Sequence, residues 1–434
     1  MTSCKASRLP ISLGFLAIVS LLAAPLVGAA TPARAEALLL VDADSGKVLR
    51  AENATYPWYP ASLSKLMTLY VTLSAIRDHR ITFDTLFTVS SNAWSQSPTK
   101  MGFPIGTQVT VDNALKMLMV KSANDMAVLL AEGIDGSTDK FAEEMTLTAQ
   151  SLGMTESNFV NPNGLPADGQ ISSARDLAIL ARALIKQFPQ YSFYWHIPAI
   201  KYGRRIVRNY NPLIGRYPGA DGMKTGFICA SGFNLVATAT RGNKRLIAVV
   251  LGAPSGAARA VKAAEMLESG FRQNPLAWLT PSLGTVDELK AINTDPPNLK
   301  DEMCGKHRKR ALAEDEDLDE EAANAQSGGV ATGNVGAGDM GSSQFSFLLS
   351  ALRAPTPQNL NLLSDAGPVV PIVVYTGPTR AVPPQDTDVT AVHAKPRPKP
   401  KKPKVAAAPA GEKPEVAKPA PKAASKPKPK NPAS

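Results

Sequence analysis

A serine and a lysine one helical turn apart could form a nucleophile and its base. Ser62 and Lys65 open a stretch with helical spacing of apolar residues, so both side chains would lie on one helix face. A serine hydroxyl is a poor nucleophile near neutral pH and needs a base within hydrogen-bond reach. Lysine can serve if burial or neighbouring positive charge lowers its pKa. The pair therefore predicts acyl transfer, with the helix N-terminus stabilising the charge that develops on the acyl oxygen.

The spacing alone is a weak signal, because Ser97–Lys100, Ser137–Lys140 and Ser425–Lys428 share it. A capping serine followed by a solvated lysine is the ordinary explanation of such a match. The last pair lies in a Pro-rich tail, and the other two lie in stretches expected to be turns or surface. Only Ser62 is expected to precede a long amphipathic helix, to about Ile76.

Ser122 and Asn124 could form a second polar pair, two residues apart on a loop. The serine could relay a proton between a lysine and the leaving group, and the asparagine amide could hold a substrate carbonyl. The same residue types favour a helix N-cap, and Ser90–Asn92 has the same spacing. Taken alone, this pair does not distinguish catalysis from capping.

Lys224, Thr225 and Gly226 occur in this order once, at the start of a strand-like region. An edge strand there would border a cleft. The lysine supplies fixed positive charge and the threonine a hydroxyl, which together suit a terminal carboxylate. The glycine would let a substrate lie close to the strand.

These three groups, in this order, resemble the serine D-alanyl-D-alanine carboxypeptidases, the low-molecular-mass penicillin-binding proteins. The resemblance runs from about Ala37 to Phe271. It also covers the stretches Pro60–Thr68, Ser122–Asp125, Leu152–Met154, Asn161–Leu165 and Asp221–Gly226.

By this resemblance, each group has a role. Ser62 is the acylated nucleophile, Lys65 is its general base, and Ser122 and Asn124 form a second catalytic wall. Substrate binding falls to Lys224, Thr225, Gly226 and Phe227. The backbone N–H groups of Ser62 and Phe227 would form the oxyanion hole.

The implied reaction removes the terminal D-Ala from peptidoglycan stem pentapeptides, and β-lactams would inhibit it by acylating Ser62. No cofactor is implied, and the four scattered histidines predict no metal site. A D,D-endopeptidase shares every motif. A β-lactamase would need a second base, for which Glu156 is the only glutamate between Met154 and Asp176. A non-catalytic cell-wall-binding or scaffold protein is the alternative from another class.

The chain departs from the family pattern at three places. Ile228 follows Phe227 where a hydroxyl residue is more frequent, and Gln170 stands where histidine is common. Beyond Asn274, no regular run of alternating strands predicts the β-rich second domain of many relatives, and the chain ends in Lys and Pro rather than an amphipathic helix.

The elements that must position these residues predict an α/β fold, an α+β sandwich. Apolar strands around a turn are expected at Ala37–Asp42 and Ser45–Leu49, and a hairpin at Phe233–Leu251. Helical spacing lies between them and again at Ala257–Phe271. The intervening helices are expected at Val111–Met119, Asp125–Gly133, Thr138–Leu152 and Ala174–Lys186. We expect one antiparallel sheet formed by both ends of the domain, covered by helices, with an inserted helical subdomain.

Composition divides the rest of the chain. Residues 1–35 are typical of a secretory signal, with cleavage before Glu36, although an uncleaved anchor is the competing interpretation. The catalytic domain is expected at 36–274. An acidic and Gly/Ser-rich linker, mostly disordered, follows at 275–392, and a Lys/Pro/Ala-rich basic tail at 393–434.

The net charge of +10 belongs to the tail, which holds eleven Lys and one Arg against two Glu. The export signal and the tail's lack of aromatic residues argue against nucleic acid as a partner. The tail could contact an anionic membrane surface or wall polymer, or act as a solvated spacer. We therefore expect an exported protein of the periplasm or cell envelope, with association with the outer face of the inner membrane left open. Cys229 and Cys304 could form a disulfide in that compartment, which the sequence does not decide.

Overall fold

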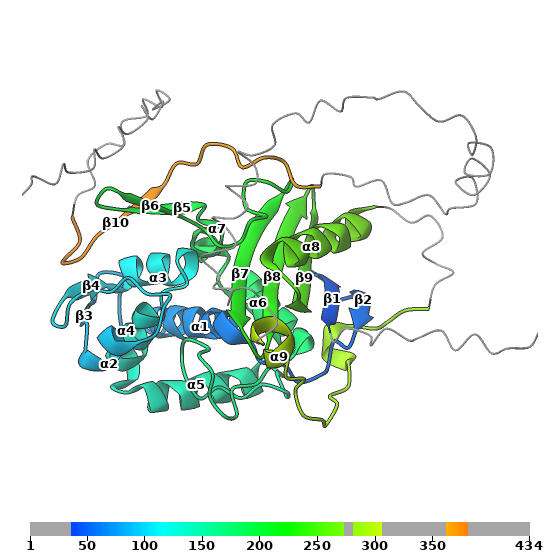
Figure 1. Ribbon diagram of the computed structural model, residues 1–434, viewed down its shortest axis with the longest axis horizontal. Helices are drawn as coiled ribbons and strands as arrows, with labels where there is room; N and C mark the ends of the chain where they lie inside the picture. The colour runs from blue at the N-terminus through cyan, green and yellow to red at the C-terminus, as the bar shows by residue number, and fades with distance from the viewer. Residues whose placement is uncertain (1–35, 273–280, 306–361, 381–434) are drawn as a thin grey trace, which may run out of the picture. The chain divides into compact units, whose positions relative to one another are not determined.

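The computed structural model describes residues 36–272, 281–305 and 362–380 (Figure 1). A five-stranded antiparallel sheet with the order β2-β1-β9-β8-β7 forms its centre. The strands are β1 (Ala37–Asp42), β2 (Val48–Glu52), β7 (Ala220–Ile228), β8 (Gly232–Arg241) and β9 (Lys244–Ala253). Ala37 pairs with Leu251, so the two ends of the domain meet in one sheet and the predicted fold is confirmed.

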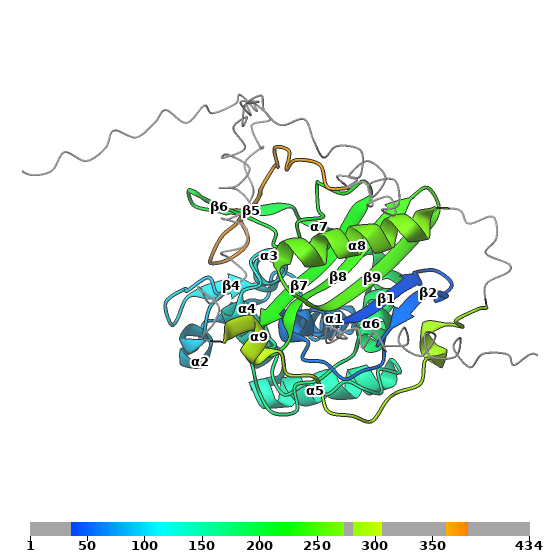
Figure 2. The same ribbon diagram turned by 45° about the vertical axis from the view of Figure 1, so that its right-hand side comes forward.

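The sheet is covered on both faces because its strands alternate between two apolar clusters. In β1, Leu38 and Leu40 join one cluster, whereas Leu39 and Val41 join the other. Helix α8 (Gly256–Phe271) covers the first face, and α1 (Ser64–Arg77) and α6 (Ala174–Gln187) lie on the second (Figure 2). The sheet and these helices therefore form the sandwich that the sequence predicted.

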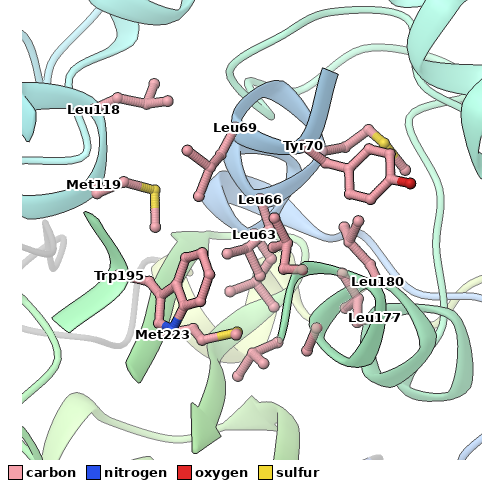
Figure 3. Close-up of a cluster of buried hydrophobic side chains, with 14 of the residues drawn as sticks. Leu63, Leu66, Leu69, Tyr70, Leu118, Met119, Leu177, Leu180, Trp195 and Met223 are labelled. Carbon is pink, nitrogen blue, oxygen red and sulfur yellow. The ribbon is translucent and has the colours of Figure 1, made fainter. Parts of the chain in front are cut away.

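Helix α1 is buried on almost every side, which differs from the amphipathic helix expected. Every residue from Ser64 to Leu73 is buried. Figure 3 shows Leu66, Leu69 and Tyr70 of α1 within a cluster to which α3, α6, α7 and β7 also contribute. A helix enclosed in this way has no polar face to solvate, so even its lysine must find polar partners inside the protein.

The helical insertion lies between β2 and β7. It contains α2 (Ser91–Ser95), α3 (Val111–Val120), α4 (Asn124–Asp135) and α5 (Thr138–Ser151), with the short pair β3 (Leu86–Thr88) and β4 (Gln108–Thr110). The turns η2 (Ala61–Leu63) and η3 (Pro189–Tyr191) precede α1 and α7 (Phe193–His196). The four helices predicted in this region are thus present, each within one or two residues of its expected bounds.

Two segments beyond Asn274 pack on the domain, past the boundary expected from sequence. The first carries η5 (Val286–Glu288) and α9 (Lys300–Cys304), and Val286 and Met303 are fully buried. A disulfide joins Cys304 to Cys229, with 5.6 Å between the α-carbons.

The second segment contributes β10 (Ile372–Val374), which pairs in parallel with β5 (Ala199–Tyr202) and extends its hairpin with β6 (Arg205–Arg208). The rest of the expected linker, the signal and the basic tail lie outside the described residues. No helix within the described part of the chain is long and apolar enough to cross a membrane.

Candidate active site

Ser62 lies in the short turn η2 directly before α1, so its side chain stands at the N-terminal end of a buried helix. The ammonium nitrogen of Lys65 lies 2.9 Å from Ser62 Oγ. Lys65 is fully buried, whereas Ser62 is partly exposed. The structure therefore brings the predicted nucleophile and base into hydrogen-bond contact, with the hydroxyl on the accessible side.

Two further acceptors surround Lys65 Nζ, each at 2.7 Å: Asn124 Oδ1 and the backbone carbonyl of Asn163. Both are amide oxygens, which accept hydrogen bonds and cannot donate them. Ser62 Oγ differs because a hydroxyl can do either. Lys65 is thus held by two fixed acceptors and also contacts the Ser62 hydroxyl, which can exchange a proton with it.

Asn163 belongs to a loop that packs against the turn of the nucleophile. A β-carbon built on Gly164 would lie 1.8 Å from the carbonyl oxygen of Ala61, so only glycine fits there. Thr68 Oγ1 donates to the carbonyl of Pro162 at 2.6 Å and ties the same loop to α1. The sequence indicated this stretch only through the family resemblance, because backbone carbonyls carry no residue-type signal.

Ser122 and Asn124 lie between α3 and α4, on the loop where the sequence placed them. Ser122 adopts φ +59, a left-handed conformation that is uncommon for residues other than glycine. Its hydroxyl oxygen is buried and has no hydrogen-bond partner among the described residues. Neither side chain caps α4, which has no side-chain cap, so the capping interpretation does not hold.

A loop at residues 96–103 supports Asn124 from the other side. Asn124 Nδ2 donates to the carbonyl of Ser97, and its backbone N–H donates to that of Thr99. Asp125 accepts from the backbone N–H groups of Met101 and Gly102. Burial raises the pKa of Asp125, although these hydrogen bonds oppose the shift. The carboxylate therefore fixes the loop that orients the asparagine.

Strand β7 is at the end of the sheet order and forms the opposite wall. Gly226 lies against η2, and a β-carbon there would be 2.9 Å from the backbone nitrogen of Ser62. Phe227 follows it and stacks on Phe233 of β8, with 4.3 Å between ring centroids. The predicted edge strand is therefore present, in backbone contact with the nucleophile's turn.

Lys224 and Thr225 are both buried on β7. Lys224 Nζ donates to the carbonyl of Thr225 at 3.0 Å. The hydroxyl of Thr225 has no hydrogen-bond partner among the described residues, like that of Ser122. Buried hydroxyls are normally satisfied, so two such groups at one site are available to a polar substrate.

Asn234 and Trp58 position the nucleophile's turn, and sequence reasoning missed both. Asn234 is fully buried on β8 and donates from Nδ2 to the carbonyl of Tyr59 at 3.0 Å. Trp58 donates from Nε1 to the carbonyl of Ser231 at 3.0 Å. The signal available for Asn234 was a polar residue within an apolar strand. Nothing in the sequence indicated that its amide would bind the carbonyl of Tyr59.

Gln170, one of the departures from the family pattern, has a clear structural role. Its Oε1 accepts from the backbone N–H groups of Val160 and Asn161, and its Nε2 donates to Ser64 Oγ at 2.9 Å. Gln170 thus joins the Asn163 loop to the first residue of α1.

Glu156 is fully engaged elsewhere in the structure. Its two carboxylate oxygens accept from Ser173 Oγ at 2.7 Å and from the backbone N–H of Ile292 at 3.1 Å. Burial raises its pKa. A structural role accounts for this side chain, which disfavours it as a second hydrolytic base. Among the described residues, no group of three or more His, Cys, Asp or Glu side chains could hold a metal ion.

The other two Ser–Lys pairs within the described residues have structural roles. In the first, Lys100 Nζ donates to the carbonyl of Trp94, and the Ser97 carbonyl accepts from Asn124 Nδ2. Ser137 caps α5 by accepting from the backbone N–H of Lys140. Phe141 and Met145 of α5 are buried, so Ser137 precedes an amphipathic helix. This agrees with the helix predicted at Thr138–Leu152, and the expectation that only Ser62 precedes such a helix is wrong. Lys140 itself is exposed, which separates this pair from Ser62 and Lys65. Ser90, from the Ser90–Asn92 pair that has the spacing of Ser122 and Asn124, likewise caps a helix, α2.

The Peptidase S11 family model, described as D-alanyl-D-alanine carboxypeptidase, matches residues 26–255. DacA of Haemophilus influenzae is 36% identical over 242 residues, which are 55% of this chain and 62% of that protein. DacD of Escherichia coli is 38% identical over 239 residues, 54% of this chain and 62% of its own length. The chain therefore spans less than two thirds of these relatives.

Solved structures show the same similarity. Penicillin binding protein 5 from Haemophilus influenzae has a TM-score of 0.53 at 36% identity, covering 55% of this chain and 71% of its own. Penicillin binding protein 6B from Escherichia coli has a TM-score of 0.52 at 38% identity, covering 54% of this chain and 76% of its own.

Proposed function

The chain belongs to the peptidase S11 family of D-alanyl-D-alanine carboxypeptidases, and from this we propose that it removes the terminal D-Ala of peptidoglycan stem pentapeptides through an acyl-enzyme on Ser62. The arrangement around Lys65 is the observation that carries the proposal. Two amide oxygens occupy two hydrogens of its amino group, and the third position faces Ser62 Oγ. A neutral amine would keep both amide contacts and direct its lone pair at the serine hydroxyl.

Acylation begins when Ser62 Oγ attacks the carbonyl carbon of the penultimate D-Ala and its proton passes to Lys65. A tetrahedral intermediate forms, and the oxyanion accepts from the backbone N–H groups of Ser62 and Phe227. The bond between this carbon and the nitrogen of the terminal D-Ala then breaks. The proton reaches the leaving nitrogen, for which the partnerless hydroxyl of Ser122 is a suitable relay. Free D-Ala and a Ser62 ester result.

Deacylation uses the same groups. A water molecule attacks the ester carbonyl and gives its proton to Lys65. The ester bond breaks, and Ser62 Oγ takes the proton back. The product is a stem peptide shortened by one residue, and the enzyme returns to its starting state.

Substrate binding would use the wall formed by β7. The terminal carboxylate pairs with Lys224 and Thr225, and Gly226 lets the peptide lie close to the strand. The Asn124 amide, already oriented by Ser97 and Lys65, holds a peptide carbonyl. A β-lactam presents a carboxylate and a strained amide to the same groups, so we expect it to acylate Ser62 and hydrolyse slowly.

We place this activity outside the cytoplasm, with residues 1–35 as the export signal and the tail at 393–434 in contact with anionic membrane or wall polymer. The Cys229–Cys304 disulfide supports export, because such bonds persist in oxidising compartments.

The test uses residues 36–434, since segments beyond Asn274 pack on the domain. Labelled penicillin should form a covalent adduct, and a diacyl-Lys-D-Ala-D-Ala peptide should release D-Ala. Ser62→Ala should abolish both. Ser137→Ala is the matched control, because Ser137 and Lys140 have the same spacing as Ser62 and Lys65. This variant removes a helix cap, which costs about 1 kcal/mol of stability, and should leave both activities intact.

Absence of adduct and of D-Ala release in the parent chain would remove the enzymatic proposal and favour a non-catalytic role. Rapid turnover of penicillin would indicate a β-lactamase. Cleavage of cross-linked dimers in place of the pentapeptide would indicate an endopeptidase.

A further inference from the structure

The outer face of the three-stranded sheet carries a row in which two exposed aliphatic side chains flank a lysine. Lys201 of β5 pairs with Val373 of β10 on one side and with Ile206 of β6 on the other. Side chains at paired positions lie on the same face of a sheet. Val373 is 40% exposed and Ile206 is 57% exposed, and Val370, just before β10, is 61% exposed. Val373 and Ile206 therefore meet solvent on either side of one lysine, and Val370 is exposed near the start of β10.

The same hairpin is strongly basic. Arg204, Arg205 and Arg208 are exposed together with Lys201, and Arg380 lies just beyond β10. Arg208 reaches the carbonyl of Gly367, a neutral partner. None of these five cations forms an ion pair with an acidic side chain in the described residues. Lys201 and Arg208 share the face of Ile206, Arg204 lies in the turn beside it, and Arg205 lies on the opposite face. Positive charge therefore surrounds the exposed aliphatic side chains at this end of the sheet.

A hollow of about 480 Å³ lies between β10 and the β5–β6 turn. Lys201 and Arg380 line it, together with Tyr202 and Tyr375. The Arg380 guanidinium carbon lies 5.6 Å from the centroid of the Tyr375 ring. Cations and tyrosines around a hollow of this size suit a phosphate-bearing headgroup, because both can donate hydrogen bonds to its oxygens.

We propose that this face docks the protein on the surface of a bilayer that contains anionic phospholipid. The cations contact headgroup phosphates, and Ile206 and Val373 enter the interface between headgroups and acyl chains. Exposed aliphatic residues among cations are typical of surfaces that lie on membranes. A fully hydrated polyanion would use the cations and leave Ile206 in water, so the apolar row favours lipid.

This face lies at one end of the described structure. Figures 1 and 2 both show β5, β6 and β10 at the end of the described structure away from α5. Strand β10 lies beyond residue 255, where the family match ends, so part of the surface comes from sequence outside that match. The inference concerns a second surface and does not depend on the proposed peptidase activity.

The first experiment measures partition of residues 36–434 onto vesicles of phosphatidylglycerol and phosphatidylcholine, and onto phosphatidylcholine alone. Lys201→Glu with Arg204→Glu should weaken binding to the anionic vesicles by roughly tenfold or more, given the contribution of each basic residue near a charged surface. Lys47→Glu with Lys140→Glu is the matched control, since both lysines are exposed, lie away from this face and give the same change in net charge. Equal loss in both double variants, or none in the first, would overturn the proposal.

The second experiment reports insertion directly and does not respond to the basic tail. Ile206→Cys, labelled with an environment-sensitive fluorophore, should shift its emission to the blue on anionic vesicles. Leu147→Cys on α5 is the control, because Leu147 is 59% exposed, much like Ile206. No shift at position 206, or the same shift at 147, would overturn membrane docking.

Other occupants give distinct outcomes with the same probe. A blue shift without lipid, on adding a peptide of residues 314–321, would assign the face to the chain's own acidic run. A shift that depends only on protein concentration would assign it to a second copy of the chain. A shift with isolated peptidoglycan and none with vesicles would assign it to the wall. Each of these results contradicts the lipid proposal.

Discussion

Gly226 and Ser62 are in contact through their backbones, although they are far apart in sequence. A β-carbon on Gly226 would lie 2.9 Å from the nitrogen of Ser62 and 3.1 Å from both Leu63 N and Pro60 O. The lack of a side chain at Gly226 therefore lets β7, which carries Lys224, lie close to the turn that carries the nucleophile. The distance between β7 and the turn of Ser62 is therefore set by direct packing of their backbones.

Gly226→Ala should displace the nucleophile's turn, because the three neighbouring atoms belong to the backbone and cannot rotate away. We expect the rate of acylation by labelled penicillin to fall by roughly 100-fold, because small misplacements of reacting groups cause losses of this size. Gly367→Ala is the control, since no heavy atom lies within 4 Å of its would-be β-carbon. An unchanged acylation rate in Gly226→Ala would show that the turn tolerates displacement.

Asn124→Asp should change the pH dependence of acylation. The new carboxylate would replace the amide oxygen that lies 2.7 Å from Lys65 Nζ, and its negative charge would hold a proton on the lysine. The acid limb of the pH–rate profile should therefore move to higher pH. Stopped-flow acylation across a pH series measures it; a profile that only decreases in amplitude would contradict Lys65 as the base.

Gln170→Ala should loosen the loop that carries Asn163, because two backbone N–H groups lose their acceptor. We expect a loss of about 1–3 kcal/mol in the free energy of unfolding and slower acylation. Gln170→His can still accept one of these bonds and should recover most of the rate. If alanine lowers stability and leaves acylation unchanged, Gln170 has no part in positioning Lys65.

Asp125→Asn should alter how stability depends on pH. Since burial raises the pKa of Asp125, the folded state binds this proton more tightly than the unfolded chain. Its stabilising contribution is complete below the unfolded pKa of about 3.9 and is lost as the pH rises through the raised folded pKa. The parent should therefore lose stability relative to Asp125→Asn as the pH rises from about 4.

Urea unfolding at several pH values tests this difference, with Asp139→Asn on the exposed surface of α5 as the control. A constant difference between the parent and Asp125→Asn would mean that Asp125 does not titrate differently in the two states.

Cys229→Ala with Cys304→Ala should destabilise the fold, since the bridge joins the end of β7 to a segment 75 residues later. We expect a loss of about 2–4 kcal/mol in the free energy of unfolding, chiefly because the unfolded chain gains freedom. Denaturant unfolding of the parent with and without reductant provides the comparison. A reductant effect that persists in the double variant would point to a cause other than this bridge.

The sequence by itself determined the elements and the order of the chemical groups. Strand and helix periods are local, so β1, β8, β9 and the helices α3 to α6 could be predicted within a few residues. Ser62, Lys65, Ser122, Asn124 and Gly226 could be proposed as site residues because their side-chain types and order carry the signal. Local pattern failed for α1, because enclosure on almost every side depends on elements distant in the chain.

Only the tertiary structure decided what surrounds these residues. The carbonyl of Asn163 beside Lys65, the carbonyl of Tyr59 on Asn234, and the pairing of β10 with β5 all involve backbone groups, which are the same in every residue. Their partners follow from how distant segments pack, and residue types do not reveal that. The Cys229–Cys304 bridge likewise could not be predicted without the distance between the two α-carbons. Two cysteines in a sequence show only that a disulfide is chemically possible.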